Sequence, residues 1–289
     1  MNSIQNYQNE AEFLRLLKGQ RTAYSNAKNF QIIDVISIII AIIPTILILR
    51  ELDFANLIAV IGVFWTIVSI FSEIYRTNQT KTGAVIQEQF DTELFEIPWN
   101  SILVGTRIDI AKIIELSRKY KKEDLQGWYS KEINEDIEHK IAVLLCYKEN
   151  AIWGLLQRNK FIKFILIITI LYYGVMILLS VYKNTGIYDL AVFLAPSLPF
   201  LVYSSTTIKS QKEIVQSYKI INRVVDDLLE RFQKDKIEPD DTQLRQIQDL
   251  FYTQRIVPHK VPNWFYNIFR QQTNGLADEA LSTIKNKLK

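Results

Sequence analysis

Uncharged hydrophobic runs alternate with long polar segments along this chain. Residues 54–72 and residues 164–182 each contain 19 residues without a charged side chain, close to the roughly 20 apolar residues with which a helix crosses a bilayer. Residues 35–49 form a shorter uncharged run, and residues 187–208 form a fourth run that includes Asp189, Pro196 and Pro199. We interpret all four runs as membrane spans.

Very short polar connections join these runs in pairs. Only residues 50–53 separate the first two runs, and only residues 183–186 separate the last two. Connections of this length place consecutive helices side by side in opposite directions. The sequence therefore predicts an all-α integral membrane protein with two transmembrane helical hairpins and a helical cytosolic domain. Pro196 and Pro199 are expected to kink the fourth span.

The polar segments divide the chain into five regions. We predict an amphipathic cytosolic helix in residues 1–30, hairpin 1 in 31–72, a cytosolic helical region in 73–163, hairpin 2 in 164–208 and a second cytosolic helical region in 209–289. The first thirty residues lack the basic start and early apolar run of a cleavable signal peptide. Their helix either lies on the membrane surface or packs on the cytosolic domain.

Two hydrophobic stripes indicate helices that continue the membrane spans into the cytosol. The first stripe leads into the third span and comprises Ile133, Ile137, Ile141, Leu144 or Leu145, Ile152 and Leu156. The second follows the fourth span and comprises Ile214, Tyr218, Ile221, Val225, Leu228 and Phe232. Its alternating steps of four and three residues suit either a helix packed on its own domain or a seam between copies in a homo-oligomer.

The distribution of charge predicts the orientation in the membrane. Of the 34 Lys and Arg residues, 32 lie outside the two short hairpin connections. The positive-inside rule therefore places both termini and the middle region in the cytoplasm. The formal net charge of +3 in 289 residues is too small to indicate binding to a nucleic acid polymer.

Several kinds of chemistry are missing from the sequence. The nine glycines are scattered, which excludes the common phosphate-binding loops of nucleotide-hydrolysing enzymes. His139, His259 and the single Cys146 are far apart in the sequence, so no metal site with ordinary ligand spacing is predicted. We expect no enzyme activity and no cofactor. The spans lack a mid-membrane Lys, Arg or Glu, which argues against a coupled transporter.

Three polar and aromatic tracts stand out in the predicted cytosolic part: residues 87–91, residues 97–100 and residues 261–266. Each combines polar side chains with prolines or aromatic rings, which suits either a rigid helix junction or a pocket for a planar ligand. Basic residues could contact an anionic ligand or a solvated surface. They are Arg107, Arg118, Lys119, Lys121, Lys122, Arg255, Lys260 and Arg270.

Four motifs carry a resemblance that covers nearly the whole chain. They are QEQFDTELFEIPWN at 87–100, GWYS at 127–130, CYKENAIW at 146–153 and RIVPHKVPNWFY at 255–266. With the two tight hairpins, they make the chain similar to the SMODS-associated four-transmembrane family of pore-forming effectors from bacteria. The resemblance implies a role in cyclic-oligonucleotide antiphage signalling, in which a second messenger makes the effector permeabilise the bacterial inner membrane and kill the infected cell.

The resemblance also suggests where a cyclic oligonucleotide would bind. We expect binding by the cytosolic helices near the first and last motifs, with residues 209–232 passing the change to the fourth span. Because four helices leave no lumen, a pore would require a homo-oligomer in the lipid bilayer. The alternatives are a small oligomeric ion channel, or a membrane-anchored scaffold without nucleotide control. The candidate ligand-binding residues are Gln87, Asp91, Trp99, Asn100, Trp128, Tyr129, Arg255, Lys260, Trp264 and Arg270.

Overall fold

The computed structural model describes residues 3–49, 55–121, 124–182 and 197–288, with residues 184, 186, 190, 191 and 194. Every regular element in these residues is a helix, which confirms the predicted all-α class. The elements are α1 (Ile4–Tyr7), α2 (Ala11–Leu49), α3 (Ala55–Leu94), α4 (Ser101–Val104), α5 (Ile110–Arg118), α6 (His139–Tyr182), α8 (Leu198–Asp235), α9 (Asp241–Arg255) and α10 (Asn263–Leu288).

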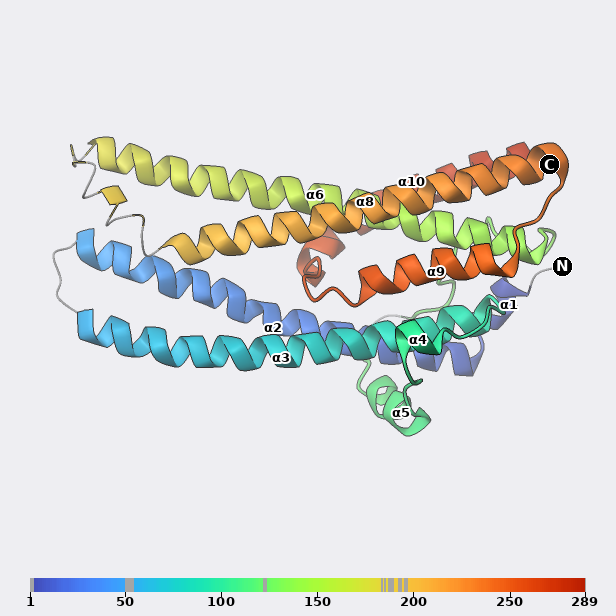
Figure 1. The fold of residues 1–289 in the computed structure, drawn as a ribbon, viewed down its shortest axis with the longest axis horizontal. Coiled ribbons are helices and arrows are strands. Elements are labelled where there is room, and N and C mark those ends of the chain that lie inside the picture. Colours follow the sequence, from blue (N-terminus) through green and yellow to red (C-terminus); the bar gives the residue numbers. More distant parts are fainter. Residues whose placement is uncertain are drawn as a thin grey trace.

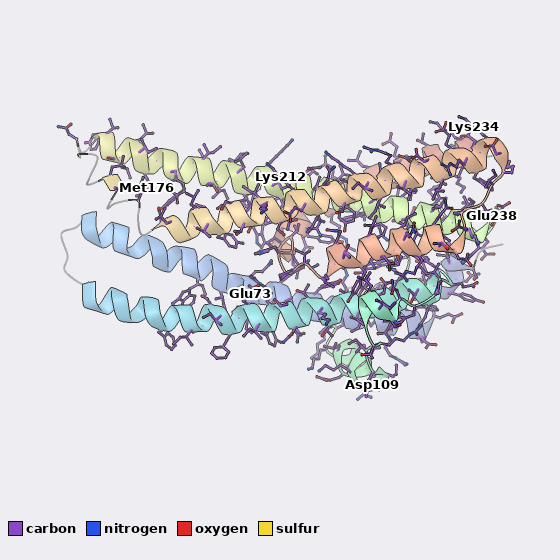
Figure 2. The ribbon with its side chains drawn as sticks, in the orientation of Figure 1. Glu73, Asp109, Met176, Lys212, Lys234 and Glu238 are labelled. Carbon is purple, nitrogen blue, oxygen red and sulfur yellow. The ribbon has the colours of Figure 1, made fainter. Side chains whose placement is uncertain are left out.

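Four long helices give the molecule its elongated shape (Figure 1). α2 lies beside α3 and α6 lies beside α8, and these are the two most extensive helix pairs. The shorter helices and both termini gather at one end, where Figure 2 shows the charged Lys234 and Glu238. Met176 lies toward the opposite end. Each long helix therefore connects a polar end of the molecule to an apolar end.

The hydrophobic core of the polar end is built mainly from α2, α3, α6, α8 and α9. α2 contributes Leu17, which is fully buried, and α3 contributes Ile86 and Phe90. The start of α2 thus packs in this core, and the same helix continues to Leu49 without a break. Of the two alternatives for the first thirty residues, the structure shows packing on the rest of the domain.

The hydrophobic stripe of α8 faces the core of its own chain. Its six members, from Ile214 to Phe232, are each no more than 8% exposed. They pack with α6 and α9 in the main core cluster. The structure therefore supports the packing of this helix on its own domain, and any seam between copies would have to use another surface.

The helix that leads into the third predicted span starts later than its stripe suggests. α6 begins at His139, whereas Ile133 and Ile137 lie in turns closed by hydrogen bonds to the carbonyl oxygens of Ser130 and Asn134. Ile133 is nevertheless completely buried. The spacing was misleading because a turn can also direct an apolar side chain into the core.

Pro199, one of the two prolines of the fourth run, does not act as predicted. α8 begins at Leu198, so Pro199 lies in its first turn, where a missing N–H removes no helical hydrogen bond. The predicted kink at Pro199 is therefore wrong, because the proline starts the helix. The predicted connection at residues 50–53, together with Asp189 and Pro196, lies outside the described residues.

Exposed apolar side chains cover the end of the molecule opposite the termini. Leu178 and Val181 on α6, Phe64 and Phe71 on α3, and Val202 on α8 are each 59–71% exposed. Among the described residues, α6 is the one helix long and apolar enough to cross a membrane, and only 11% of its most apolar stretch is buried. A large exposed apolar surface of this kind suits contact with lipid. Four spans in two hairpins remain a prediction.

Candidate functional site

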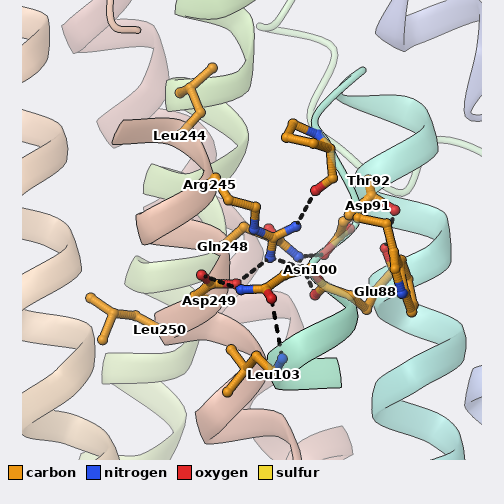
Figure 3. A network of polar contacts seen from close by, with 12 residues as sticks. Glu88, Asp91, Thr92, Asn100, Leu103, Leu244, Arg245, Gln248, Asp249 and Leu250 are labelled. Atoms are coloured by element: carbon orange, nitrogen blue, oxygen red, sulfur yellow. Dashed lines mark hydrogen bonds and ion pairs between the residues drawn. The ribbon is translucent and has the colours of Figure 1, made fainter. Parts of the chain in front are cut away.

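A buried polar network joins α3 to α9 in the polar end of the molecule (Figure 3). Glu88 and Asp91, one helical turn apart on α3, have no exposed side-chain surface. Arg245 of α9 contacts Glu88 at 2.5 Å, and Arg255 at the end of α9 contacts Asp91 at 2.5 Å. Gln248 donates to Glu88 at 2.7 Å and to Asp91 at 3.2 Å. Two carboxylates are thus held in the core by two guanidinium groups and an amide.

The network continues from Asp91 toward α6. The hydroxyl of Tyr129 donates to Asp91 at 3.0 Å and accepts from the side-chain amide of Asn150 at 3.1 Å. Burial raises the pKa of Glu88, while the positive charges of Arg255 and Arg245 act in the opposite direction. These contacts fix α3, α6 and α9 relative to one another, because each buried polar group needs its partner.

A large cavity opens beside this network. Its volume is about 670 Å3, within the range of roughly 300–1,000 Å3 that is usual for small-molecule sites. The large cavity lies among α2, α3, α6, α10 and the segment 124–132. Its lining residues are Gln20, Arg21, Tyr24, Gln87, Asp124, Leu125, Gln126, Gly127, Trp128, Tyr129, Ser130, Lys131, Glu132, Glu149, Asn150, Trp153, Tyr266, Arg270, Asn274 and Asp278.

Aromatic rings and one guanidinium group form part of this lining. The rings of Trp153 and Tyr266 stack with centroids 5.3 Å apart and an interplanar angle of 26°. The guanidinium carbon of Arg21 lies 4.9 Å from the centroid of Trp128 and 5.6 Å from that of Tyr266. Planar groups therefore occur together at the cavity wall, which favours a ligand that stacks.

Gln20 of α2 is an unpartnered polar group in the lining. The residue is 1% exposed, and both polar atoms of its side chain lack a hydrogen-bond partner among the described residues. A buried amide without partners costs free energy. Such a group at a cavity wall points to a ligand that offers one donor and one acceptor.

Glu149 of α6 gives the large cavity a charge that depends on pH. Its carboxylate accepts a hydrogen bond from the backbone N–H of Ser130 at 3.0 Å. Burial raises the pKa of Glu149 from 4.5 to about 7, although the bond from Ser130 opposes this effect, and the charge of Asp278 adds to the rise. Near neutral pH this carboxyl group is divided between its neutral and charged forms.

A small cavity adjoins the large one. It has a volume of about 180 Å3 and shares Tyr24, Gln87 and Asn150 with the large cavity. Its other lining residues are Lys28, Arg158, Tyr218, Phe251, Arg255 and Lys260. No carboxylate is among these described lining residues, whereas four of them are basic.

The structure brings together six of the ten candidate residues from the sequence. Gln87, Trp128, Tyr129 and Arg270 line the large cavity, while Gln87 also lines the small cavity with Arg255 and Lys260. Asp91 lies behind the wall, bound to Tyr129. Whether these residues bind a ligand remains a prediction.

Like Asp91, the three remaining candidate residues line neither cavity. The side-chain oxygen of Asn100 caps α4 by accepting from the N–H of Leu103 at 3.2 Å, and its amide donates to Asp249 at 3.0 Å. The indole of Trp99 donates to the carbonyl oxygen of Gly105 at 2.9 Å. Trp264 is 53% exposed and lies against Phe164. Proximity to a proline in sequence did not distinguish these junction residues from lining residues.

Several lining residues escaped the sequence argument. Gln20, Arg21 and Tyr24 belong to the first thirty residues, where the amphipathic pattern indicated only a packing or membrane surface. Asn150 and Trp153 stand in the CYKENAIW motif, and that motif was the signal by which they could have been found. Among the described residues no group of three His, Cys, Asp or Glu side chains could hold a metal ion.

Comparisons with known proteins give one family and one curated relative. The model of the SMODS-associating 4TM effector domain matches residues 2–284. A probable CBASS effector molecule from Bacillus cereus (strain VD146) is 27% identical over 293 residues, which cover 97% of this chain and 96% of the relative. No solved structure matches the chain.

Proposed function

The chain belongs to the SMODS-associating 4TM effector family, and we propose that it is a messenger-gated membrane effector of bacterial antiphage defence. In this proposal four spans cross the bacterial inner membrane as two hairpins, with both termini in the cytoplasm. A cyclic oligonucleotide binds the large cavity, and the protein then makes the membrane permeable. The infected cell dies before the phage spreads.

The observation that supports this proposal most is the position of the large cavity on the long helices. α2, α3 and α6 all contribute lining residues, and the same helices continue toward the apolar end. Trp153 precedes the uncharged run that begins at Phe164 by 11 residues, or about 16 Å along a helix. A ligand that shifts these helices in the cavity would shift their membrane parts as well.

The lining suits the bases of an oligonucleotide. Bases stack on aromatic rings and on guanidinium planes, as Trp153, Tyr266 and Arg21 allow, and their edges offer donors and acceptors together. The unpartnered amide of Gln20 and the amide of Asn150 match such edges. A purely apolar ligand would leave the Gln20 amide unsatisfied.

The segment between α9 and α10 offers a second connection to the membrane helices. Gln31 of α2 donates to the carbonyl oxygen of Lys260 at 2.9 Å, and Gln211 of α8 donates to that of His259 at 2.8 Å. The segment thus links α2 to α8, one helix from each pair. Movement of this segment on ligand binding would change how the two helix pairs fit together.

Binding alone does not open a membrane protein. The messenger must bind the permeable state more tightly than the resting state, and a change from 1:99 to 99:1 needs a difference of about 5.5 kcal/mol. A cavity lined by several helices can supply such a difference, because its shape depends on their arrangement. We propose that the permeable state is a homo-oligomer, since one four-helix bundle has no lumen.

Replacing Trp153 with leucine is expected to weaken binding of the cyclic oligonucleotide by roughly 5- to 150-fold, because stacking contributes about 1–3 kcal/mol per base. The measurement is isothermal titration of the full chain in detergent with a panel of cyclic di- and trinucleotides. Trp264→Leu is the matched control, since Trp264 lies outside both cavities. The proposal predicts that this control keeps its affinity. Equal losses in both variants, or no binding to any panel member by the folded wild type, would count against it.

A further inference from the structure

The small cavity has an unusual balance of charge. Lys28 of α2, Arg158 of α6, Arg255 of α9 and Lys260 of the following segment line it together. Of the described lining residues, none is a carboxylate. Arg255 has a partner of opposite charge, which is Asp91 at 2.5 Å. Cations from four parts of the chain therefore converge on about 180 Å3 of space.

Lys260 is the most unusual of these groups because it is a buried lysine. It is 8% exposed, and its ammonium nitrogen donates to the carbonyl oxygen of Arg255 at 2.5 Å and lies 5.1 Å from the centroid of the Tyr24 ring. Burial, followed by the charges of Arg158, Lys28 and Arg255, holds the pKa of Lys260 well below its usual range. Buried lysines are normally paired with an anion, and none of the described residues forms an ion pair with Lys260.

Amide oxygens are the hydrogen-bond partners of two further cations in the lining. Arg158 donates to the side-chain oxygen of Gln211 at 2.6 Å, and Lys28 donates to that of Asn263 at 2.9 Å. An amide oxygen satisfies a donor without neutralising its charge. The guanidinium group of Arg158 is therefore held in position with its charge available to a ligand.

The large cavity has the opposite character. Its basic residues Arg21, Lys131 and Arg270 are accompanied by four carboxylates, those of Asp124, Glu132, Glu149 and Asp278. Bases with polar edges suit this mixed surface, whereas a phosphate would meet repulsion from the carboxylates. The anionic part of a ligand that spans both cavities belongs in the small one.

We propose that the small cavity is a phosphate-binding site in which Lys260 and Arg158, supported by Lys28, hold a phosphodiester group. The volume equals that of about six waters at roughly 30 Å3 each, which suits one phosphate and its first hydration shell. The cyclic oligonucleotide of the proposed function is the first source of this phosphate, and to that extent the assignment rests on the proposed function. A lipid headgroup is the second source, because Arg158 precedes the uncharged run at Phe164 by six residues.

The first test uses inorganic phosphate and the full chain in detergent. Phosphate is expected to raise the melting temperature of the wild type, measured at constant ionic strength with chloride as the reference anion. The affinity for phosphate is obtained from the dependence of the melting temperature on phosphate concentration. Lys260→Met and Arg158→Gln should each lower this affinity about ten- to hundred-fold, as expected for a lost hydrogen bond between charged groups. Two variants are used because each side chain also makes a hydrogen bond to the protein.

Lys160→Met is the matched control. Lys160 lies on α6 two residues after Arg158 but lines neither cavity, and it donates to Gln272 at 2.7 Å. This variant should respond to phosphate as the wild type does. If phosphate stabilises no form of the protein beyond chloride, or if Lys260→Met and Arg158→Gln respond like the wild type, the phosphate site is refuted.

Two further measurements, of oligonucleotide affinity and of stability in nanodiscs, distinguish the two sources of phosphate. They also distinguish failure of the phosphate site from failure of the proposed function. Loss of cyclic-oligonucleotide affinity in Lys260→Met and Arg158→Gln, with Lys160→Met unaffected, supports the messenger as the source. Stabilisation by phosphatidylglycerol over phosphatidylcholine nanodiscs that depends on Lys260 supports a lipid headgroup. A Lys260-dependent phosphate response without any oligonucleotide binding supports the site while the proposed function fails. Oligonucleotide binding that is unaffected in both variants, together with no Lys260-dependent response to phosphate or phosphatidylglycerol, overturns the site and leaves the proposed function in place.

Discussion

Replacing Arg255 with methionine is expected to lower the free energy of unfolding by about 3–5 kcal/mol, because the change leaves a buried carboxylate without its cation. Arg255 is 7% exposed and lies 2.5 Å from Asp91, whose side chain has no exposed surface. Tyr129 and Gln248 would still donate to Asp91. Neutral donors cannot replace the lost charge, so a large part of the penalty should remain.

The effect can be measured by thermal unfolding of the detergent-solubilised chain, with tryptophan fluorescence as the signal. A loss of this size lowers the melting temperature by roughly 5–8 °C for a chain of this length. Lys234→Met is the control, because Lys234 pairs with Glu230 on the surface and both side chains are more than half exposed. Its melting temperature should not change.

A double variant tests the physical reason directly. Asp91→Asn combined with Arg255→Met removes both charges, so it should recover part of the stability that Arg255→Met alone loses. If the single variant is as stable as the wild type, Asp91 is not buried as the structure describes. Because Arg255 also lines the small cavity, its variants are unsuitable for testing ligand binding.

Replacing Glu149 with glutamine is expected to stabilise the protein at high pH and to have little effect at low pH. The folded protein holds the proton of Glu149 more tightly than the unfolded chain does, since burial raises its pKa from 4.5 to about 7. Between these values the folded state binds more protons, so stability falls as pH rises. The full penalty, about 3 kcal/mol, applies once the pH exceeds 7.

Glutamine keeps an oxygen that can accept the hydrogen bond from Ser130 but carries no charge at any pH. The difference in melting temperature between Glu149→Gln and the wild type should therefore be small near pH 4.5 and increase to its maximum near pH 8. The wild type and the variant are compared in the same buffers at both pH values. An equal difference at the two values, or a variant that is less stable at pH 8, contradicts the assigned burial of this carboxyl group.

The sequence was sufficient to predict the helical class because hydrophobic periodicity is a local property. The stripe from Ile214 to Phe232 identifies the cytosolic part of α8, and all six of its members are buried. The same periodicity failed at Ile133 and Ile137, which lie in turns. Apolar spacing reports which side chains reach the core, but it does not report the backbone conformation that brings them there.

The candidate site was only partly predictable because its wall is made by contacts over long sequence separations. Tyr24 and Gln87 are 63 residues apart and are joined by a hydrogen bond of 3.1 Å. Tyr266 lies against Trp153, and no local pattern links these two residues. Arg255 and Lys260 were identified from a basic and aromatic tract, whereas Trp264, from the same tract, lines neither cavity and is 53% exposed.

The aromatic and basic residues around the two cavities form separate groups. Stacking groups gather in the large cavity with its mixed charge, and four basic side chains gather in the small cavity next to it. The two cavities meet at Tyr24, Gln87 and Asn150 on α2, α3 and α6. A ligand with bases and a phosphodiester would contact three of the four long helices at once, and this is what a switch acting on those helices requires.

The central claim is that a ligand in the cytosolic cavities makes the membrane permeable. The most direct test is dye release from liposomes that hold the full chain, titrated with the panel of cyclic di- and trinucleotides and repeated with Trp153→Leu and Trp264→Leu. The account predicts release that depends on one panel member, shifts to higher concentration in Trp153→Leu and is unchanged in Trp264→Leu. Release without any ligand would indicate a constitutive channel, and no release from inserted protein that binds the ligand would indicate a membrane-anchored scaffold. Either result would contradict the account.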